Sequence, residues 1–552
     1  MTAFLSRHTL HLTPLSPLHL GTGEDYEPTN YVIADSILYA FNPAQAILTP
    51  AQRNDLLEAG KRADLQAIQR FFRKYPEPFI AVAHSISSTS NALNKEYADN
   101  FGEVVQRENS HRQVLNRFQI ERTATNPQTH APYIPGSALK GCIRTALLEE
   151  KSVDHKGEKP DARIAAQFER DYLGSFATDL LRLFKPADFS ACGHIATHIQ
   201  YATNHKKKRI VKDGRIVTGK GVTGRRETIL HGQYRAFRGE CTLQNLILDH
   251  KPHIKNPQQN LPAQRQLSLA ELAIASNRYH LPRFLKEAHI LAERRLVNEQ
   301  WLTSTHQLLN ALKAQLESGQ ILLVRLGKNG GAESKTLEKY AQIKIMGARG
   351  ARATYEKTTK TLWLASPSNH ADHNLLPFGW SLIEIDPQSD NPALQTWCTK
   401  NGEQLAAAQA QIAALHEKRQ AALEQAAEAQ AQQAREAAER AEREACEKAA
   451  IEAEKARIAA LPPEERIAAE LLASLAEHSK TFSERNQEKN NTLYSHIIDT
   501  LQQAASELDS AAQKRLAEKA SLKTLQNACK GLITGKKETG LKSILKTLRG
   551  EA

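Results

Sequence analysis

The first 400 residues contain short runs in which apolar and polar residues alternate, a pattern typical of half-buried β-strands. Leu10 and Leu12 alternate with polar neighbours and predict a strand over residues 4–12, which Pro14 should break. Residues 31–41 predict either one strand or a hairpin that turns at Ala34-Asp35-Ser36. Further strands are expected at residues 234–248, 321–325, 360–365 and 380–385.

Apolar residues at helical spacing predict helices within residues 44–76 and 264–318, the second interrupted at Pro282. In the first of these, Phe71 and Phe72 are spaced to face a core. Residues 85–115 are polar and rich in Ser and Asn, which favours a loop with short helices.

Residues 133–150 read YIPGSALKGCIRTALLEE. The Pro-Gly pair predicts a turn, and Ser137 stands where the N-cap of the following helix belongs. Lys140 and Arg144 lie one turn apart near the helix start, where cations beside free backbone N–H groups would form a phosphate site. The alternative is an ordinary strand–turn–helix with two solvated cations. One stripe of the helix should face a core: Leu139, Ile143, Ala146 and Leu147.

Residues 403–461 contain no Gly, Pro, Trp, Tyr or Phe and consist mostly of strong helix formers, which predicts one long helix that Pro462 ends. Large apolar residues are too sparse to support a long parallel coiled coil. Acid-first pairs such as Glu436–Arg440 are typical of a solvated helix. We expect this helix to be largely exposed and detached from the preceding sheets, with a separate small helical bundle after it.

The composition of the chain indicates which broad class of protein it is. The 552 residues have room for two to four domains, and a hydrophobic content of 41% indicates a mainly globular chain. The formal net charge of +12 suits a polyanionic partner, although many basic proteins bind no nucleic acid. Six widely spaced cysteines without a Cys-x-x-Cys motif indicate free thiols in a reducing compartment. With no signal-peptide pattern and no long apolar run, we expect a soluble cytoplasmic protein that contacts no membrane.

A glycine loop follows the first strand. His19 precedes Gly21 and Gly23, which permit positive φ and a close approach of the backbone to a ligand. His19 itself is placed to stack on a base or to donate to a phosphate. The alternative is a glycine turn before a strand, in which His19 only packs.

The most basic segment, residues 205–226, holds nine Lys or Arg residues against the single acid Asp213. Asp213-Gly214 predicts a tight type I′ hairpin between two basic strands. Because so many like charges repel one another unless phosphates neutralise them, the segment favours RNA contact over a disordered solubilising loop.

A late glycine-rich run, residues 324–337, reads VRLGKNGGAESKTL and places Arg325, Lys328 and Lys335 around its glycines. It is neither a Walker A motif nor GxGxxG, but it suits backbone donors that grip an RNA phosphate. A glycine-rich hairpin loop with solvated lysines is the alternative. Elsewhere Cys192, His194 and His198 suggest a metal site, but two more ligands at zinc-like spacing are lacking, so we expect no metal and no other cofactor.

The run IPGSALKGCIRTAL resembles the signature of the RAMP proteins of type III CRISPR systems, in which a glycine-serine turn leads into a helix carrying Lys and Arg. The opening LTPLSPLHLGTGEDYEPTNYVIADSILYAF is similar to the N-terminus of the family of fifth Csm subunits in type III-A effector complexes. The late run VRLGKNGGAESKTL resembles the glycine-rich loop of that family. The three blocks occur in the family's order and span residues 12–337.

The resemblance implies an α+β fold of two ferredoxin-like (RRM-like) RAMP modules, followed by the long helix and a small C-terminal helical bundle. The basic hairpin would correspond to the projecting thumb of related subunits, which crosses the guide–target duplex. The expected domains are residues 1–185, 186–400, 401–461 and 462–552.

The implied function is that of a non-catalytic RNA-binding subunit that caps the 3′ side of the CRISPR RNA and supports its maturation in antiviral defence. Its partners would be CRISPR RNA and target RNA, the other Csm subunits, above all the RAMP backbone subunit, and host trimming nucleases. One alternative is a metal-independent precursor-RNA endonuclease that uses His19, and another is a coiled-coil assembly scaffold. The expected RNA-binding residues are His19, Gly21, Gly23, Ser137, Lys140, Arg144, Lys206, Lys207, Lys208, Arg209, Arg225, Arg226, Arg325, Lys328 and Lys335.

Overall fold

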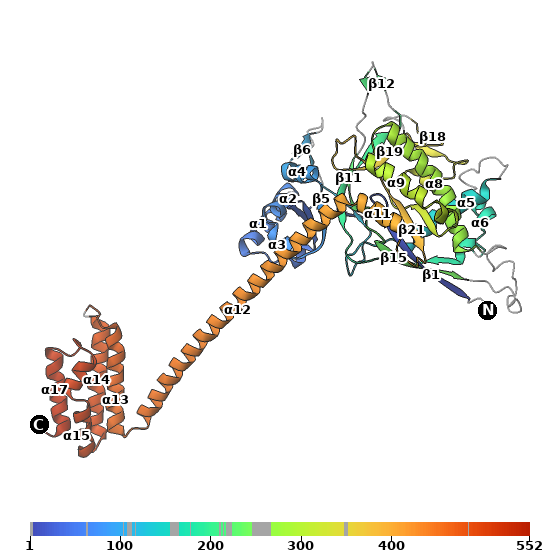
Figure 1. The fold of residues 1–552 in the computed structure, drawn as a ribbon. Coiled ribbons are helices and arrows are strands. Elements are labelled where there is room, and N and C mark those ends of the chain that lie inside the picture. Colours follow the sequence, from blue (N-terminus) through green and yellow to red (C-terminus); the bar gives the residue numbers. More distant parts are fainter. Residues whose placement is uncertain are drawn as a thin grey trace. The chain divides into compact units, whose positions relative to one another are not determined.

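The computed structural model of the chain describes residues 4–61, 65–102, 104–107, 113–115, 118–154, 165–176, 178–208, 211–212, 215–216, 223–244, 267–346, 352–483 and 485–551. The chain forms two compact units, 1–417 and 418–552. The first combines sheets with helices, and the second is built from helices (Figure 1). This mixed α+β architecture with a helical C-terminal part confirms the predicted fold class in outline, while the number of ferredoxin-like modules stays a prediction.

The first sheet has β1 at its centre and, within the described residues, runs in the order β10-β15-β1-β21-β16, with β9 also paired to β15. Strand β1 pairs antiparallel with both β15 and β21, so the two ends of unit 1 meet in one sheet. It continues to Pro14, beyond the predicted end, because a proline as the last strand residue leaves the preceding ladder intact. The strands are β1 (Leu5–Pro14), β9 (Phe184–Pro186), β10 (Ser190–Ala191), β15 (Phe237–Gln244), β16 (Ile321–Arg325) and β21 (Trp380–Ile385).

The second sheet runs in the order β2-β8-β14-β11-β5-β4-β3, with β19 on β11 and β20 on β19. Both sheets draw strands from before and after residue 185, so the two predicted modules are not separate sheets, and the boundary itself stays a prediction. The strands are β2 (Gly21–Tyr26), β3 (Tyr31–Ala34), β4 (Ile37–Phe41), β5 (Ala83–Thr89), β8 (Ile120–Thr123), β11 (Thr197–Lys206), β14 (Gly224–Ile229), β19 (Thr361–Ser366) and β20 (Leu376–Pro377).

Helices and short strands complete unit 1. They are η1 (Pro43–Gln45), α1 (Pro50–Lys61), α2 (Leu65–Lys74), α3 (Glu77–Ala81), α4 (Asn91–Asn100), β6 (Val104–Arg107), β7 (Gln113–Leu115), α5 (Gly136–Ser152), α6 (Ala165–Leu173), η2 (Leu180–Arg182), β12 (Val211–Lys212), β13 (Arg215–Ile216), α8 (Leu269–Glu293), α9 (Glu299–Ala311), α10 (Lys313–Glu317), η4 (Ala332–Lys335), β17 (Ile343–Ile345), β18 (Thr354–Glu356) and α11 (Pro392–Lys400).

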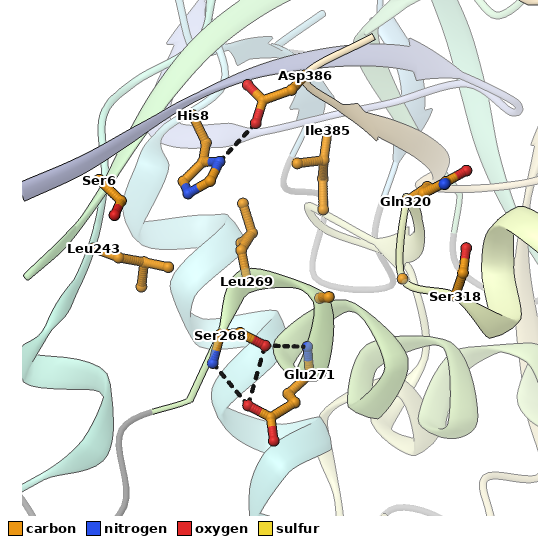
Figure 2. Close-up of a pocket in the computed structure, with 12 residues that line it drawn as sticks. Ser6, His8, Leu243, Ser268, Leu269, Glu271, Ser318, Gln320, Ile385 and Asp386 are labelled. Atoms are coloured by element: carbon orange, nitrogen blue, oxygen red, sulfur yellow. Dashed lines mark hydrogen bonds and ion pairs between the residues drawn. The ribbon is translucent and has the colours of Figure 1, made fainter. Parts of the chain in front are cut away.

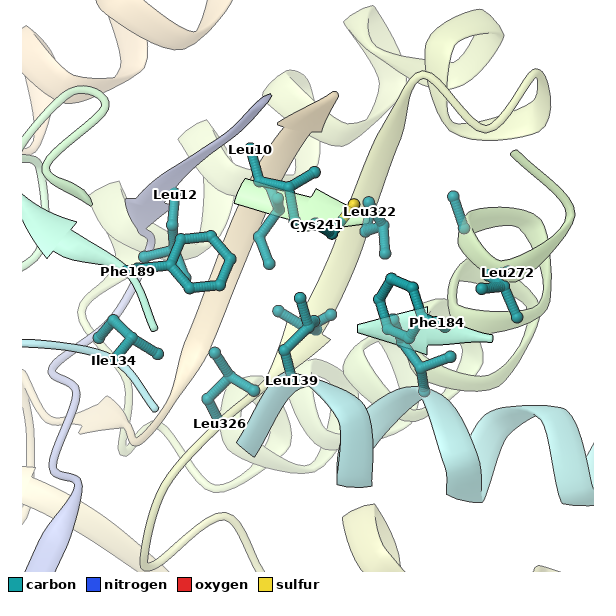
Figure 3. Close-up of a cluster of buried hydrophobic side chains, with 14 of the residues drawn as sticks. Leu10, Leu12, Ile134, Leu139, Phe184, Phe189, Cys241, Leu272, Leu322 and Leu326 are labelled. Carbon is teal, nitrogen blue, oxygen red and sulfur yellow. The ribbon is translucent and has the colours of Figure 1, made fainter. Parts of the chain in front are cut away.

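Helix α5 closes the main core of unit 1 against the first sheet (Figure 3). The predicted apolar stripe is confirmed: Leu139, Ile143, Ala146 and Leu147 are all buried. In Figure 3 Leu139 points from α5 toward the layer that holds Leu10 of β1 and Leu326, just after β16. The signature helix is therefore held by strands from both ends of unit 1.

The start of α5 differs from the prediction. The helix begins at Gly136, with Pro135 as the N-cap, so Ser137 is an exposed residue of the first turn and not the cap. The N–H of Gly136 donates to Asp188 Oδ1 at 2.8 Å, which supplies the missing acceptor from another segment. A Cβ at Gly136 would lie 2.5 Å from the carbonyl oxygen of Pro186, so only glycine allows this close approach.

Two other expectations of the sequence are confirmed. Residues 31–41 form the hairpin of β3 and β4, and its two turn residues Asp35 and Ser36 have φ of 51° and 62°, as a type I′ turn requires. Phe71 and Phe72 are 5% and 3% exposed and pack with Phe79 in a satellite core.

Two predictions were wrong. Residues 83–89, which overlap the start of the segment 85–115 that we expected to be a loop with short helices, form β5 in the interior of the second sheet. The strand is polar because its buried hydroxyls have partners: Ser87 bonds to Thr197, and Ser88 bonds to His198. Helix α8 runs straight through Pro282, where we expected an interruption.

Helix α12 (Glu403–Ala459) has 57 residues and confirms the predicted long helix. Its first turns are not detached from the sheets. Ala408 and Ile412 are each only 4% exposed, and Gln411 Nε2 donates to the carbonyl oxygen of Asp35 at 2.8 Å. The described side chains between 427 and 457 are exposed, so the expectation of an exposed helix holds for that stretch alone.

Unit 2 has its own hydrophobic core after α12, as expected for a separate bundle. Leu475, Ile497, Leu501 and Leu541 are fully buried in it. Within the described residues, no helix combines the length and apolar character needed to cross a membrane. The helices are α13 (Pro463–Thr481), α14 (Gln487–Glu507), α15 (Ser510–Lys519), α16 (Leu522–Ala528) and α17 (Lys536–Arg549).

The two glycines of α5 give a matched test of the packing at Gly136. Gly136→Ala should lower the free energy of unfolding of unit 1 by about 1–3 kcal/mol, because the new methyl group collides with backbone. Gly141→Ala, on the same helix with no atom within 4 Å of the added carbon, should raise it by up to about 1 kcal/mol. Urea unfolding followed by near-UV signals measures both, and equal shifts of the same sign would contradict this account.

Candidate nucleic-acid interface

Glu121 joins segments that are far apart in the sequence. Neighbouring strands β8 and β14 place Arg226 opposite Glu121, and Arg226 Nη1 donates to Glu121 Oε1 at 2.7 Å. Lys328, from the late glycine-rich run, donates to Glu121 Oε2 at 2.6 Å. His19 Nε2 faces the same carboxylate oxygen at 3.5 Å. One carboxylate therefore connects the early glycine loop, the base of the basic hairpin and the late loop.

The His19 ring lies inside this cluster and is fully buried. Its Nδ1 lies 2.7 Å from the backbone carbonyl oxygen of Glu227, which can only accept, so Nδ1 carries the proton. The predicted stacking of His19 on a base does not fit this position, because a buried ring has no free face. Its role in the structure is to orient the loop that carries Gly21.

The two glycine loops contact each other through their backbones. The N–H of Lys328 donates to the carbonyl oxygen of His19 at 2.9 Å. Gly327 has φ of 80°, and a Cβ there would collide with the same carbonyl oxygen. Gly21 is less constrained, since a Cβ there would lie 3.2 Å from His19 Nε2, and Gly23, with φ of 86°, is exposed with open space around it. The early and late glycine runs therefore lie side by side and are joined through their backbones.

The base of the basic hairpin borders the late loop. Arg226 Nε donates to Asn329 Oδ1 at 3.0 Å, and Lys207 Nζ donates to Glu333 Oε1 at 2.5 Å. Arg225 instead pairs with Glu96 at 2.5 Å. Three of the predicted cations in this segment are therefore bound to acidic or amide groups of unit 1.

The tip of the predicted hairpin is only partly described. Arg209 and the turn Asp213-Gly214 lie outside the described residues. The flanking strands β12 and β13 pair with Lys212 opposite Arg215, the register that a two-residue turn at 213–214 produces. Lys206 and Lys208, at the hairpin base, have no ion pair with any described residue and are half-buried and exposed, respectively.

The predicted phosphate site on α5 is occupied by the protein itself. Lys140 Nζ donates to the carbonyl oxygen of Phe184 at 3.0 Å. Arg144 pairs with Asp179 at 2.5 Å and with Glu169 at 3.1 Å. Burial lowers the pKa of Lys140. Burial opposes the charged form of Arg144 as well, but its two carboxylate partners outweigh that effect and raise the pKa of Arg144. Lys140 and Arg144 are therefore bound within the protein and are not a pair of solvated cations.

The flanking cations of the late loop differ from one another. Arg325 is 9% exposed, pairs with Glu287 at 2.8 Å and lies over the Trp380 ring at 4.8 Å. It therefore supports the core. Lys335 is exposed and has no ion pair within the described part of the chain. Lys328, 54% exposed, is both bound to Glu121 and open to solvent.

Burial and the neighbouring groups shift the pKa values of Glu121 and Glu227. Burial alone would raise the pKa of Glu121, but His19, Lys328 and Arg226 outweigh it and lower that pKa to about 2. Glu227 is fully buried on β14, and burial raises its pKa although Ser87, the Thr123 N–H and Tyr26 donate to it. Glu121 is thus a fixed anion that binds the surrounding cations, and Glu227 is a satisfied buried acid.

Sequence reasoning missed the acidic residues Glu121, Glu227 and Glu96 and the amide of Asn329. Glu121 stands in the short run QIERT, whose alternation is too brief to indicate a strand. Only the pairing of β8 with β14 brings it beside Arg226. A count of Lys and Arg along the chain carries no information on such partners.

A second polar site lies near the start of β1, at the end of the strand away from His19. It lines a cavity of about 560 Å³ (Figure 2). His8 Nδ1 and Asp386 Oδ2 are 2.6 Å apart, and the other oxygen of Asp386 accepts the Thr9 N–H at 2.7 Å. The facing residue Ser268 caps α8 in a capping box with Glu271. The lining mixes polar and apolar residues and carries no Lys or Arg, so it does not fit a phosphate backbone.

His198, one of the residues that suggested a metal site, is buried and bonded within the second sheet. His198, of the Cys192–His198 run, bonds through Nδ1 to Ser88 Oγ at 2.8 Å, and burial lowers its pKa to about 4. Its partner is thus a hydroxyl. The described residues contain no group of three or more His, Cys, Asp or Glu side chains arranged for a metal ion.

Residues 11–257 match the family model described as the RAMP superfamily, so this part of the chain is similar to that superfamily. The resemblance inferred from the IPGSALKG signature is thereby confirmed. The matched region contains the early glycine loop, Glu121, α5 and the base of the hairpin, whereas the late loop lies beyond it.

Two solved structures are similar to this chain. The crystal structure of T. onnurineus Csm5 is 15% identical, with 68% of this chain and 99% of that chain covered, at a TM-score of 0.36. A chain of the cryo-EM structure of a Csm-crRNA-target RNA ternary complex in a type III-A CRISPR-Cas system is 15% identical, with coverages of 68% and 100% and a TM-score of 0.33. No curated protein sequence matches the chain.

The charge cluster predicts a pH-dependent contribution of Glu121. Because the folded pKa of about 2 lies below the unfolded value of about 4.5, the carboxylate stabilises the fold fully above pH 4.5, and this contribution is lost as the pH falls toward 2. The difference in free energy of unfolding between wild type and Glu121→Gln should therefore shrink across that window.

Urea unfolding at a series of pH values measures this difference. The control is Glu58→Gln, which removes an exposed pair with Lys61 and should give a small difference with little pH dependence. A difference for Glu121→Gln that stays constant from pH 5 to pH 2 would show that the carboxylate is not held by these cations.

Proposed function

We propose that the protein is a non-catalytic RNA-binding subunit of a type III-A CRISPR effector complex. The observation that carries the proposal is the junction of the early glycine loop, the base of the basic hairpin and the late glycine loop around Glu121. Exposed backbone at glycines beside Lys206, Lys208 and Lys328 suits the grip of a phosphate chain, which needs donors and cations but no base reading.

Similarity to the RAMP superfamily supports this proposal, and so does the similarity of both glycine runs to the fifth Csm subunits. On this basis the subunit caps the 3′ side of the CRISPR RNA and supports its maturation. CRISPR RNA and target RNA, the other Csm subunits, above all the RAMP backbone subunit, and host trimming nucleases would be its partners. The cytoplasm would be its compartment.

The RNA contact is assigned to the exposed cations and not to those bound within the protein. Lys206, Lys208 and Lys335 have no ion pair with described residues and can bind phosphates without breaking one. Lys328 would exchange or share its bond to Glu121. The partners of Lys140 and Arg144 argue for a structural role on α5, where loss of either would weaken the junction with Phe184 and Asp179.

The contact can be tested through its salt dependence. The double variant Lys206→Gln, Lys208→Gln should lower the magnitude of the slope of log affinity against log salt by roughly 1.4, because each phosphate contact on a single strand contributes about 0.7. The matched control, Lys313→Gln with Lys400→Gln, removes two exposed charges from α10 and α11.

Fluorescence anisotropy with a repeat-derived RNA at 50–300 mM salt gives both slopes. The control should keep the wild-type slope. Equal reductions in the two double variants would indicate a general charge effect and would contradict a contact at the hairpin base.

We propose no cleavage by this chain, because the His19 ring is fully buried, out of reach of a substrate, and its cationic neighbours are bound to Glu121. Purified protein should leave a repeat-containing precursor RNA intact in a denaturing-gel assay, and His19→Ala should not change this. A cut that appears with wild type and disappears with His19→Ala would replace the proposal with the precursor-endonuclease alternative.

A further inference from the structure

The helical bundle of unit 2 has a strong separation of charge along its sequence. Residues 463–509, which contain α13 and α14, hold four Lys or Arg residues against nine acidic ones. Residues 514–549, which contain most of α15 and all of α16 and α17, hold ten against two. A bundle that needs charge only for solubility gains nothing from this separation, because like charges on neighbouring helices repel.

Part of the positive charge is neutralised within the bundle. Arg515 on α15 pairs with Glu464 at 2.9 Å, and Lys519 pairs with Glu465 at 3.6 Å, both at the start of α13. On α17, Lys542 pairs with Glu538 at 2.6 Å. The acidic half of the bundle therefore compensates α15 but not α16 and α17.

Apart from the exposed Lys514 on α15, the remaining cations form what we call the α16–α17 surface. Helices α16 and α17 contact each other, and none of its cations has an ion pair with a described residue. All are exposed except Lys537, which is half-exposed with its ammonium 5.4 Å from the Tyr494 ring centre. The surface consists of Lys523, Lys530, Lys536, Lys537, Lys546 and Arg549.

One face of helix α17 packs in the bundle core, and another face is exposed to solvent. Leu541, Leu545 and Leu548 are buried in the bundle core. Lys542, Lys546 and Arg549 follow at spacings of four and three residues and share a solvent-facing stripe. The apolar face thus fixes the helix in the bundle and leaves the basic stripe for a partner.

We propose that the α16–α17 surface is a second, sequence-independent binding site for single-stranded RNA. A phosphate chain supplies the repeated negative charge that six uncompensated cations need. Interfaces with nucleic acid are polar and positively charged, as this surface is.

Other partners fit less well. A stable protein interface has an apolar centre, and membrane binding by a basic helix requires an exposed apolar face. The described residues after 460 expose no large apolar side chain, because the apolar face of α17 lies in the core. A negatively charged chain, which binds through its charge alone, therefore fits the α16–α17 surface best.

The choice of RNA rests on the proposed function of unit 1. An RNA held by unit 1 is tethered to the same protein, so its free end reaches unit 2 at a raised effective concentration. The α16–α17 surface would then retain a part of the RNA that the first site does not hold.

The test uses the full chain with two triple variants of equal charge change. One is Lys530→Gln, Lys546→Gln, Arg549→Gln in the α16–α17 surface. The control is Arg435→Gln, Arg443→Gln, Lys448→Gln on exposed turns of α12, where eight cations and nine acids between residues 418 and 459 nearly balance. Binding of a 40-nucleotide unstructured RNA is measured from 50 to 300 mM salt, and bound RNA is mapped by ultraviolet crosslinking and peptide identification.

The surface variant should lower the magnitude of the salt slope by about two and lose crosslinks in residues 523–549, while the control keeps both. Wild-type slope and absence of crosslinks from those peptides would overturn the inference. So would a surface variant that binds RNA normally but no longer assembles with other subunits, because that result assigns the surface to a protein. Crosslinks at 523–549 in the wild-type protein, with no crosslinks in unit 1, would reject the first site and leave the second intact.

Discussion

The carboxylate of Glu121 is the constraint on which the candidate interface depends. It binds Arg226 and Lys328 and faces the buried His19, so three chain segments that lie about 100 to 200 residues from Glu121 along the chain meet at one group. A carboxylate has two oxygens and can accept from several donors at once, which allows one residue to hold three segments. Removal of its charge would leave Arg226, 7% exposed, without its carboxylate partner in a poorly solvated position.

Charge compensation separates the cations that build the fold from those available to a ligand. Arg144, Arg225 and Arg325 each have a carboxylate within 3.1 Å. Arginine suits such partly buried pairs because its planar fork can bond to several oxygens. Cations without an ion pair to a described residue include Lys206 and Lys208 at the hairpin base, Lys335 on the late loop, and the Lys and Arg residues of the α16–α17 surface. Their long, solvated side chains are suited to a mobile polyanion.

The residues of the signature motif at the start of α5 make contacts that stabilise the fold. Its glycine allows the chain to pass against the carbonyl oxygens of residues 186 and 187, and Asp188 accepts the first helical N–H. The helix start that would bind a phosphate in isolation is thereby capped by the protein. Lys140 and Arg144 connect the same helix to Phe184 and Asp179. The IPGSALKG run thus explains why segments 133–150 and 180–189 fold together.

The sequence by itself determined the elements whose signal is local. The 403–461 helix, the strand at 321–325, the hairpin at 31–41 and the buried stripe of α5 each follow from periodicity or turn chemistry in a few adjacent residues. The RAMP resemblance likewise rests on contiguous blocks. These features depend on neighbours along the chain, which a single sequence displays.

Only the tertiary structure decided the pairings. The polar run at 83–89 is an interior strand because Thr197, His198 and Glu227 satisfy its hydroxyls, and those partners lie over 100 residues away. Whether Lys140 or Lys208 is free to meet a phosphate depends in the same way on acceptors that sheet pairing brings near one and not the other. A cation looks the same in sequence whether it is solvated or bound, because the interaction that separates the two cases is made across the fold.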